Sequence, residues 1–376
     1  MLIGIPHETV PREARVASTP EVVKKLTALG HVVRVEAGAG VSASITDQAY
    51  AAAGAEIVGC DAAFGCEVVL KVRSPTAAEL SLFKPGAALI GMLDPFDAAN
   101  AQRLAAAQLI AFSLEAAPRT TRAQSMDVLS SQANIAGYKA MMIAADRYQR
   151  FVPMLMTAAG TVKAARVVVL GVGVAGLQAI ATAKRLGAVI EASDVRPSVK
   201  EQVESLGGKF IDVPYETDEE RQAAEGSGGY ARAMPESWLA RQKIEVAKRI
   251  ALADIVITTA LIPGRAAPLL VTAEMVRSMK PGSVIVDIAA GRGAPNPATG
   301  RAAGNCELTE ADATVVQHGV TLIGETNLAS LVAADASALY ARNVLDFLKL
   351  ILKDDGTMHV PMDDDIVAAC LVTGAA

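Results

Sequence analysis

Three glycines in the middle of the chain carry the clearest chemical signal. Gly171, Gly173 and Gly176 form the pattern G-x-G-x-x-G, after the β-branched apolar run 167–170 and at the start of a helical segment, 174–186. The first glycine allows a tight turn, the second lets the backbone approach a pyrophosphate, and the third lets the helix pack closely on the sheet. Because the N-terminus of such a helix binds anions, this stretch predicts a phosphate-binding turn.

An acidic residue follows at the position where a nucleotide ribose would need one. The next apolar run, 189–192, leads to Asp194, and an acidic side chain at the end of this second strand accepts hydrogen bonds from a ribose 2′-OH. The strand–turn–helix–strand context favours a dinucleotide site over a chance glycine turn. Asp194 favours NAD over NADP, because a carboxylate repels a 2′-phosphate, although the nearby Arg196 is able to accommodate one.

Two further stretches contain polar residues at places where ligands bind. The predicted strand 254–260 ends in Thr259, Ala260 and Leu261, which should face the nucleotide, because open α/β sheets bind ligands at the carboxyl ends of their strands. The polar stretch 118–132 lies between a strand and a helix expected at 133–148. From its residues alone it is a solvated loop with a helix cap.

Composition limits the classes of protein that the chain can represent. Its 376 residues are enough for two domains, and the net charge of −5 with 4% aromatic residues gives no sign of nucleic-acid binding. The four cysteines form no C-x-x-C pair and the four histidines are scattered, so neither a metal site nor a disulfide framework is expected. We expect no signal peptide and no inserted membrane helix, because the uncharged run 167–183 is broken by the glycine turn.

Strand-like and helix-like segments alternate along most of the chain, which predicts the α/β class. We expect two Rossmann-like, doubly wound parallel-sheet domains, the second inserted into the first and joined to it by long helices. The first would comprise residues 1–132 and 325–376, the second residues 133–324, with a long helix at 327–352 and the nicotinamide bound in the cleft between the domains. The charged, glycine-rich stretch 214–235 is typical of a functional flap or a disordered loop, and 291–304 of a mobile surface loop.

Four runs of sequence resemble one known family. The runs are RAQSMDVLSSQANIAGYKA, MTAAGTVKAARVVVLGVGVAGLQAIATAKRLGA, TTALIPG and VAADAS. They are similar to proton-translocating NAD(P) transhydrogenase, in its NAD(H)-binding component of the separate alpha-1 type. The resemblance covers nearly the whole chain. It implies a cytoplasmic homodimer that binds NAD(H) and is peripheral on the inner membrane through an NADP(H)-binding component and a membrane-spanning component. Hydride would pass directly from NADH to NADP+. The apolar segment 344–352 is a candidate dimer interface.

The resemblance also implies roles for individual residues. Arg119, Gln124 and Asp127 would organise the nicotinamide and the hydride-transfer interface, and Ser130 would bond the carboxamide. Arg119 and Asp127 are expected to pair. The residues expected to line the dinucleotide are Gly171, Gly173, Val174, Gly176, Asp194, Val195, Arg196, Gly229, Tyr230, Thr259, Ala260 and Leu261. Gly229 and Tyr230 match the family's mobile loop, whereas 291–304 looks longer than the family pattern and receives no role.

A related enzyme, alanine dehydrogenase, is the main alternative. The chain resembles it at EARVASTPE and LKVRSP, where Arg15 and Lys71 match residues that bind pyruvate. Amine–carbonyl interconversion needs a positioned acid and base, typically His and Asp. This chain has Met92 at or beside the histidine position and reads VDIAAGRG where the aspartate is expected, which argues against that reaction and leaves Arg15 and Lys71 an ion-pair or packing role. A nucleotide-binding regulator without turnover stays open.

Overall fold

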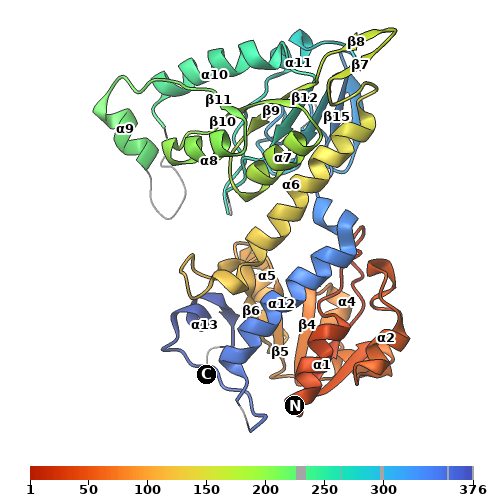
Figure 1. Ribbon diagram of the computed structural model, residues 1–376. Helices are drawn as coiled ribbons and strands as arrows, with labels where there is room; N and C mark the ends of the chain where they lie inside the picture. Colours follow the sequence, from red (N-terminus) through yellow and green to blue (C-terminus); the bar gives the residue numbers. More distant parts are fainter. Residues whose placement is uncertain (226–233, 263, 297–299, 354, 375–376) are drawn as a thin grey trace. The chain divides into compact units, whose positions relative to one another are not determined.

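The computed structural model describes residues 1–376 except 226–233, 263, 297–299, 354 and 375–376. The chain divides into two compact units (Figure 1). Unit 1 comprises Met1–Gln132 and Ala329–Ala376, and unit 2 comprises Ala133–Leu328. The chain therefore leaves unit 1, forms unit 2 and returns to complete unit 1. Helix α6 (Val128–Arg147) begins in the first unit and continues into the second.

Unit 1 is built on a seven-stranded sheet in the order β16-β6-β5-β4-β1-β2-β3. All neighbouring strands pair in parallel except β16, which runs antiparallel to β6. The strands are β1 (Leu2–Ile5), β2 (Val32–Glu36), β3 (Glu56–Val58), β4 (Val68–Arg73), β5 (Ala88–Met92), β6 (Ile110–Ser113) and β16 (Leu371–Thr373).

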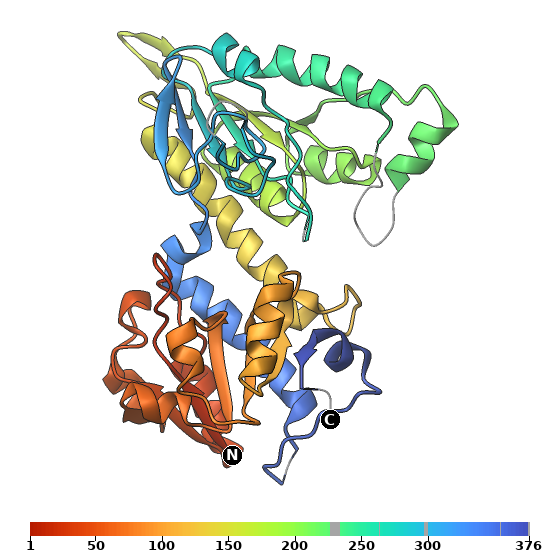
Figure 2. The ribbon, with the colours of Figure 1, turned by 180° about the vertical axis from the view of Figure 1, so that it is seen from behind.

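Both faces of this sheet are buried, because alternate residues of its central strands enter different hydrophobic clusters. Val68 and Leu70 of β4 pack with residues of helices α1 and α12, whereas Val69 packs with Phe64 and Leu104 on the other side. The ribbon in Figure 2 shows helices in front of and behind the strands of this unit. The α-helices are α1 (Pro20–Ala28), α2 (Asp47–Ala52), α3 (Cys60–Phe64), α4 (Ala77–Leu80), α5 (Ala98–Ala106), α12 (Ala333–Ile351) and α13 (Asp365–Cys370). Short 3₁₀ helices are η1 (Val41–Ala43), η2 (Leu114–Ala116) and η3 (Gln124–Met126).

Unit 2 has a second seven-stranded sheet, in the order β11-β10-β9-β12-β13-β15-β14, with only β14 antiparallel to its neighbour. Its strands are β9 (Arg166–Leu170), β10 (Val189–Ser193), β11 (Lys209–Phe210), β12 (Ile255–Thr258), β13 (Val284–Asp287), β14 (Thr314–Gln317) and β15 (Val320–Ile323). The helices are α7 (Val174–Arg185), η4 (Pro197–Val199), α8 (Lys200–Ser205), α9 (Asp218–Glu225), α10 (Glu236–Ile250), α11 (Ala273–Ser278) and η5 (Leu328–Val332), which crosses the boundary between the units. Here too Val167 and Val168 of β9 enter different buried clusters.

Both sheets reverse their strand order at one place. In unit 2 the chain builds outward from β9 through β10 to β11, then returns to place β12 on the other side of β9. In unit 1 the same reversal separates β1 from β4. This is the doubly wound Rossmann arrangement, and ligands bind where the order reverses, at the carboxyl ends of the strands. The predicted fold class, with two Rossmann-like parallel sheets, is confirmed.

Several predicted boundaries were wrong. Helix α6 begins at Val128 rather than 133, because Asp127 accepts a hydrogen bond from the Ser130 backbone N–H and caps the helix. The stretch 214–235, predicted to be a flap or a loop, contains helix α9. Gly229 and Tyr230 of this stretch lie outside the described residues. The predicted helix 327–352 is 3₁₀ up to Val332 and α-helical only from Ala333. A small antiparallel hairpin, β7 (Leu155–Thr157) and β8 (Gly160–Val162), was not predicted.

Helix α12 belongs to the core of unit 1, which overturns the prediction that 344–352 supplies a dimer interface. Val344, Phe347 and Ile351 have no exposed surface, and Phe347 contacts the Phe112 ring of β6 with 5.3 Å between the ring centroids. An interface needs accessible side chains, and the apolar side chains of this segment are already used to close the sheet.

Truncating this contact tests how much the returning segment stabilises unit 1. We predict that Phe347→Ala lowers the free energy of unfolding by about 3–5 kcal/mol, because it removes a fully buried ring and leaves a cavity. Urea titration monitored by circular dichroism measures the change. Lys349→Ala on the exposed side of the same helix is the control, with an expected change within about 0.5 kcal/mol. Equal stability of the two variants would contradict the assignment of α12 to the core.

Candidate functional site

The predicted phosphate-binding turn lies at the strand-order reversal of unit 2. Gly171 leaves β9 with a positive φ of 91°, which a side chain would strain. A Cβ there would also lie 2.9 Å from both the Ala260 backbone nitrogen and the Thr259 Oγ1 atom. Thr259 Oγ1 donates a hydrogen bond to the Gly171 carbonyl oxygen at 2.8 Å. The ends of the two central strands, β9 and β12, are therefore fastened together at the turn.

The other two glycines differ in what surrounds them. A Cβ on Gly176 would lie 2.0 Å from the Gly171 carbonyl oxygen, so helix α7 can pack this closely on the turn only without a side chain. A Cβ on Gly173 would meet no atom within 4 Å, so this residue faces open space. Gly173 is the N-cap of α7 and supplies no capping side chain, and Val174 at the first helical position is exposed. The turn thus offers helix N-terminal N–H groups and room for a phosphate group.

The Asp194 carboxylate is fully engaged within unit 2. It accepts hydrogen bonds from the Val172 backbone N–H at 2.7 Å, from the Arg196 backbone N–H at 2.9 Å, and from two guanidinium nitrogens of Arg196, each at 2.9 Å. A carboxylate has about four acceptor positions, and these contacts use them. The carbonyl oxygen of Val195, the residue between Asp194 and Arg196, accepts a hydrogen bond from the Tyr215 hydroxyl at 3.2 Å. Asp194 therefore ties the second strand to the glycine turn.

The end of β12 is held by a residue that sequence reasoning missed. The Asn305 side chain accepts a hydrogen bond from the Ala260 N–H and donates one to the Ala260 carbonyl oxygen, both at 2.9 Å. The side chain of Leu261, which follows Ala260 in the sequence, is 45% exposed. Asn305 follows a stretch of small residues that has no helix or strand pattern, so nothing in the sequence distinguishes it.

In unit 1, the structure brings Arg119, Gln124 and Asp127 together. They line one pocket of about 290 Å³ with Pro118, Thr120, Thr121 and Ala123. Arg119 and Gln124 are exposed. Asp127 accepts hydrogen bonds from the Ser130 hydroxyl at 2.6 Å and from the Ser130 N–H at 2.8 Å. The residue expected to bond a carboxamide is thus oriented by the acid that caps its helix. The expected pairing of Arg119 with Asp127 stays a prediction.

Three residues from the C-terminal segment hold this stretch in place, and none of them was predicted. Asn343 of α12 donates to the Ser125 carbonyl oxygen at 2.6 Å and accepts from the Ser131 hydroxyl at 2.8 Å. Arg122 forms ion pairs with Asp364 and Asp365 at the start of α13, and hydrogen bonds from its guanidinium lower the pKa of Asp364 to about 2. Both contacts join residues more than 200 positions apart in the sequence.

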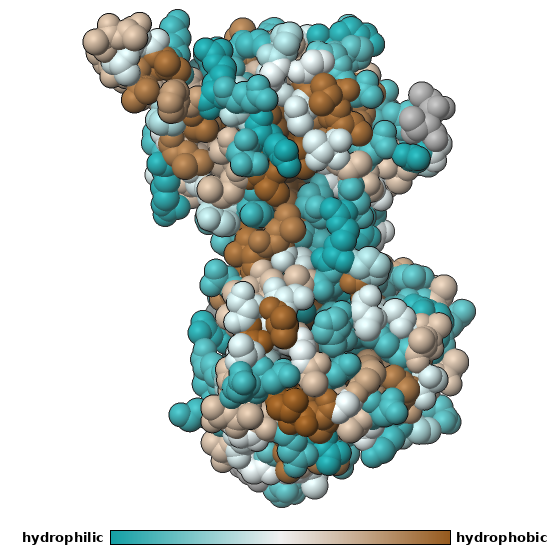
Figure 3. All heavy atoms as spheres, turned by 90° about the vertical axis from the view of Figure 1, so that its right-hand side faces the viewer, coloured by the Kyte–Doolittle hydropathy of each residue, from teal (hydrophilic) through white to brown (hydrophobic). Residues whose placement is uncertain are grey.

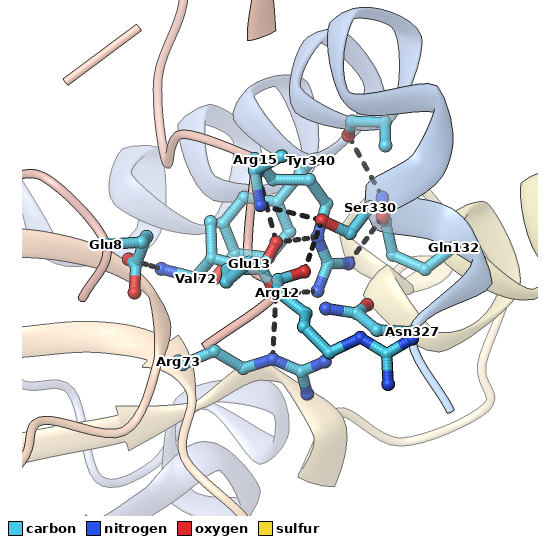
Figure 4. A network of polar contacts seen from close by, with 12 residues as sticks. Glu8, Arg12, Glu13, Arg15, Val72, Arg73, Gln132, Asn327, Ser330 and Tyr340 are labelled. Atoms are coloured by element: carbon cyan, nitrogen blue, oxygen red, sulfur yellow. Dashed lines mark hydrogen bonds and ion pairs between the residues drawn. The ribbon is translucent and has the colours of Figure 1, made fainter. Parts of the chain in front are cut away.

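Arg15 and Lys71 are held in buried ion pairs, as expected from the sequence. Arg15 pairs with Glu13 at 2.6 Å and donates to the Gln132 side chain at 2.7 Å (Figure 4). The Lys71 ammonium is fully buried between Glu8 at 3.2 Å and Glu79 at 3.1 Å. Burial raises the pKa of Glu8 more than the Lys71 ammonium lowers it. These two cations have carboxylate partners from the chain itself.

The remaining candidate acid has a structural role. Asp287 ends β13 with no exposed surface and accepts hydrogen bonds from the Thr258 hydroxyl at 2.9 Å, the Ala289 N–H at 3.0 Å and the Cys306 N–H at 2.9 Å. Burial raises its pKa against the effect of these hydrogen bonds. In the described portion of the chain, no group of three or more His, Cys, Asp or Glu side chains is arranged to hold a metal ion. Nor does any helix there combine the length and apolar character that a bilayer crossing requires.

Comparison with known proteins places this geometry in one family. Residues 4–136 match the family described as alanine dehydrogenase/PNT, N-terminal domain, and residues 140–376 match the corresponding C-terminal domain. The chain is 51% identical to a subunit alpha protein of NAD(P) transhydrogenase from Rhodospirillum rubrum, over 99% of this chain and 96% of that protein.

Solved structures agree with the sequence comparison. The structure of transhydrogenase from Sinorhizobium meliloti is similar with a TM-score of 0.87 and 48% identity, over 99% of this chain and 98% of that one. An L-alanine dehydrogenase structure is similar with a TM-score of 0.79 and 27% identity, over 99% and 94%. The chain therefore belongs to the alanine dehydrogenase/PNT family and is a homologue of the NAD(P) transhydrogenase alpha subunit.

Proposed function

We propose that this chain binds NAD(H) at the glycine turn of unit 2 and passes hydride directly between that nucleotide and NADP(H) held by a partner component. The observation that carries the proposal is the turn itself, where open space at Gly173 adjoins the uncapped start of α7 and the end of β12. A pyrophosphate fits these N–H groups and this space.

The ribose next to the pyrophosphate would meet Asp194. Because Arg196 and Val172 occupy the acceptor positions of this carboxylate, a ribose hydroxyl has to replace guanidinium contacts. Arg196 then turns to bond other parts of the nucleotide. Val174, Val195, Thr259, Ala260 and Leu261 would line the rest, as would Gly229 and Tyr230 beyond the described residues. We assign the specificity to NAD(H) because the Asp194 carboxylate remains and would repel a 2′-phosphate.

The polar pocket of unit 1 would organise the transfer. Hydride transfer between two nicotinamide rings moves no proton at the reacting carbons, so it needs rings held at near-attack distance with water excluded, and no general acid or base. Arg119, Gln124 and Asp127 line one pocket, and Ser130 has its hydroxyl directed by Asp127. We assign Ser130 to the carboxamide and Gln124 to the interface with the partner's nucleotide.

The contacts of Arg15 and Lys71 support this reaction over amino-acid dehydrogenation. A cation that binds a 2-oxo acid needs its charge available to the substrate, whereas Lys71 lies between two glutamates without exposed surface. Met92 and the fully hydrogen-bonded Asp287 provide no acid–base pair.

The proposed assembly follows from the same homology. We propose a homodimer that docks on an NADP(H)-binding and a membrane-spanning component at the cytoplasmic face of the inner membrane, so that hydride transfer is coupled to proton translocation. Hairpin β7–β8 and the residues before it offer an apolar surface for self-contact, because Phe151, Met154 and Met156 are all more than half exposed. Figure 3 shows apolar residues gathered in brown patches on the side that carries β7 and β8 in Figure 1.

Reconstitution tests the proposed reaction. The purified chain is mixed with the NADP(H)-binding component of a transhydrogenase, and transfer from NADH to NADP+ is followed by absorbance. Pyruvate plus ammonia without the partner is the parallel assay. Partner-dependent transfer with a silent parallel assay is expected. NADH oxidation in the parallel assay would establish an alanine dehydrogenase instead, and silence in both with NADH still bound would establish a regulator.

Gly173 offers a direct test of the nucleotide site. We predict that Gly173→Ala leaves the melting temperature within about 2 °C of the wild type but weakens NADH binding by roughly a hundredfold, because its methyl group meets no protein atom and occupies the phosphate position. Gly176→Ala should instead destabilise unit 2, since its Cβ collides with the backbone of the turn. Calorimetry and NADH fluorescence titration give both quantities. Unchanged NADH affinity in folded Gly173→Ala would refute this site.

Gln124 tests the role of the polar pocket. We predict that Gln124→Ala slows hydride transfer to the partner's NADP+ by roughly tenfold to a hundredfold while the dissociation constant of NADH changes less than about threefold, because the side chain acts on ring positioning. Stopped-flow kinetics and NADH titration measure the two effects. Gln102→Ala, on an exposed position of α5, is the matched control. Equal losses in rate and affinity would show that Gln124 only binds NADH.

A further inference from the structure

Asn305 directly follows the stretch 291–304, which has no assigned role, and bonds to Ala260 beside the glycine turn. Asn305 is completely buried, and its carboxamide makes three hydrogen bonds: from the Ala260 N–H, to the Ala260 carbonyl oxygen, and to the Pro268 carbonyl oxygen at 2.8 Å. We propose that Asn305 is a positioning residue that fixes the end of β12 in the shape that receives the dinucleotide. This inference rests on the proposed function.

Ala260 needs such a partner because the sheet ends before it. The pairing of β12 with β13 stops at Thr258 opposite Asp287, and the Thr259 N–H makes one more bond, to the Leu170 carbonyl oxygen of β9 at 2.8 Å. The backbone groups of Ala260 lie beyond this point and need other partners. A carboxamide supplies one acceptor and one donor side by side, so Asn305 pairs with both backbone groups of Ala260 as another strand would. A carboxylate, a hydroxyl or an apolar side chain does not reproduce this set of contacts.

Asn305 is itself rigidly held. Its backbone carbonyl oxygen accepts hydrogen bonds from the Leu270 and Val271 N–H groups at 2.8 and 2.9 Å, and the N–H of the next residue, Cys306, donates to Asp287. Asp287 therefore anchors Asn305 to the end of β13. This buried acid has a structural role and takes no part in a reaction.

The position of Ala260 determines the position of the glycine turn. The Ala260 nitrogen lies 2.9 Å from where a Gly171 Cβ would stand, and the neighbouring Thr259 hydroxyl bonds the Gly171 carbonyl. Because Thr259 directly precedes Ala260, a shift of Ala260 is transmitted to this contact through the short, β-branched side chain of Thr259. Asp287, Asn305 with the adjoining Cys306, Ala260 with the adjoining Thr259, and Gly171 are thus connected in sequence across the ends of β13, β12 and β9.

Two substitutions at Asn305 test the inference. Asn305→Ala removes all three contacts, and we expect the dissociation constant of NADH to rise by roughly tenfold or more. Asn100→Ala is the matched control, because Asn100 is also a buried asparagine that bonds a backbone carbonyl, that of Leu93, but belongs to unit 1. This control should lose thermal stability and keep its NADH affinity.

Asn305→Asp separates positioning from general destabilisation. At about pH 8.5 the new carboxylate can accept a hydrogen bond from the Ala260 N–H. It has no proton to donate to the carbonyl oxygens of Ala260 and Pro268, which the Asn305 carboxamide bonds in the wild type. Once protonated, it can both accept from and donate to Ala260, and the nearby Asp287 carboxylate favours that form. We expect NADH affinity of this variant to improve at least about threefold from roughly pH 8.5 to pH 6, with a smaller change for the wild type.

The outcomes are distinguishable. If the wild type does not bind NADH, the proposed function fails. If the wild type binds and folded Asn305→Ala or Asn305→Asp binds equally well at every pH, the inference is overturned. Amide hydrogen exchange of the wild type covers the case in which neither variant folds. The Ala260 N–H should be strongly protected before NADH is added, and protection that appears only with NADH would also overturn the inference.

Discussion

The close approach of β12 to the Gly171 turn is the constraint on which unit 2 depends. Thr259 bonds the Gly171 carbonyl, and a side chain at Gly171 or Gly176 would collide with the backbone that meets there. This contact lies at the reversal of strand order, where a doubly wound sheet opens. With Asp194 bonded to Val172 on one side and Asn305 bonded to Ala260 on the other, contacts within the protein itself fix the shape of the turn.

A preformed turn suits the proposed hydride transfer, which would depend on the position of the reactants rather than on proton transfer. Two acids near the candidate sites have structural roles. Asp287 holds the ends of the strands in unit 2, and Asp127 caps α6 beside the polar pocket of unit 1. In unit 1 the charges retained from a shared ancestry with alanine dehydrogenase neutralise one another in the pairs of Arg15 and Lys71. In the proposed reaction, catalysis would therefore depend on the geometry of the two nicotinamide rings and on the exclusion of water.

The sequence predicted the features that depend on local patterns. Gly171, Gly173 and Gly176 indicated both the turn and its unit, because their spacing reflects one backbone shape, and alternating segments predicted two Rossmann-like sheets. Contacts between distant segments were missed. Asn305 and Asn343 carry no local pattern, and the pairing of Arg122 with Asp364 joins residues that only the folded chain brings together. Segment 344–352 was misassigned because an apolar helix face packs equally well on a sheet or on a partner.

The most direct test of the central claim is the isotope dependence of single-turnover hydride transfer. The chain and the NADP(H)-binding component of a transhydrogenase are mixed with NADH or with NADH deuterated at C4, in H2O and in D2O, across roughly pH 6–9. Direct transfer governed by positioning predicts a primary isotope effect from C4 deuteration, no solvent isotope effect and a flat pH profile. A solvent isotope effect with a bell-shaped pH profile would contradict the account, because it would require an acid or base that the described residues do not provide.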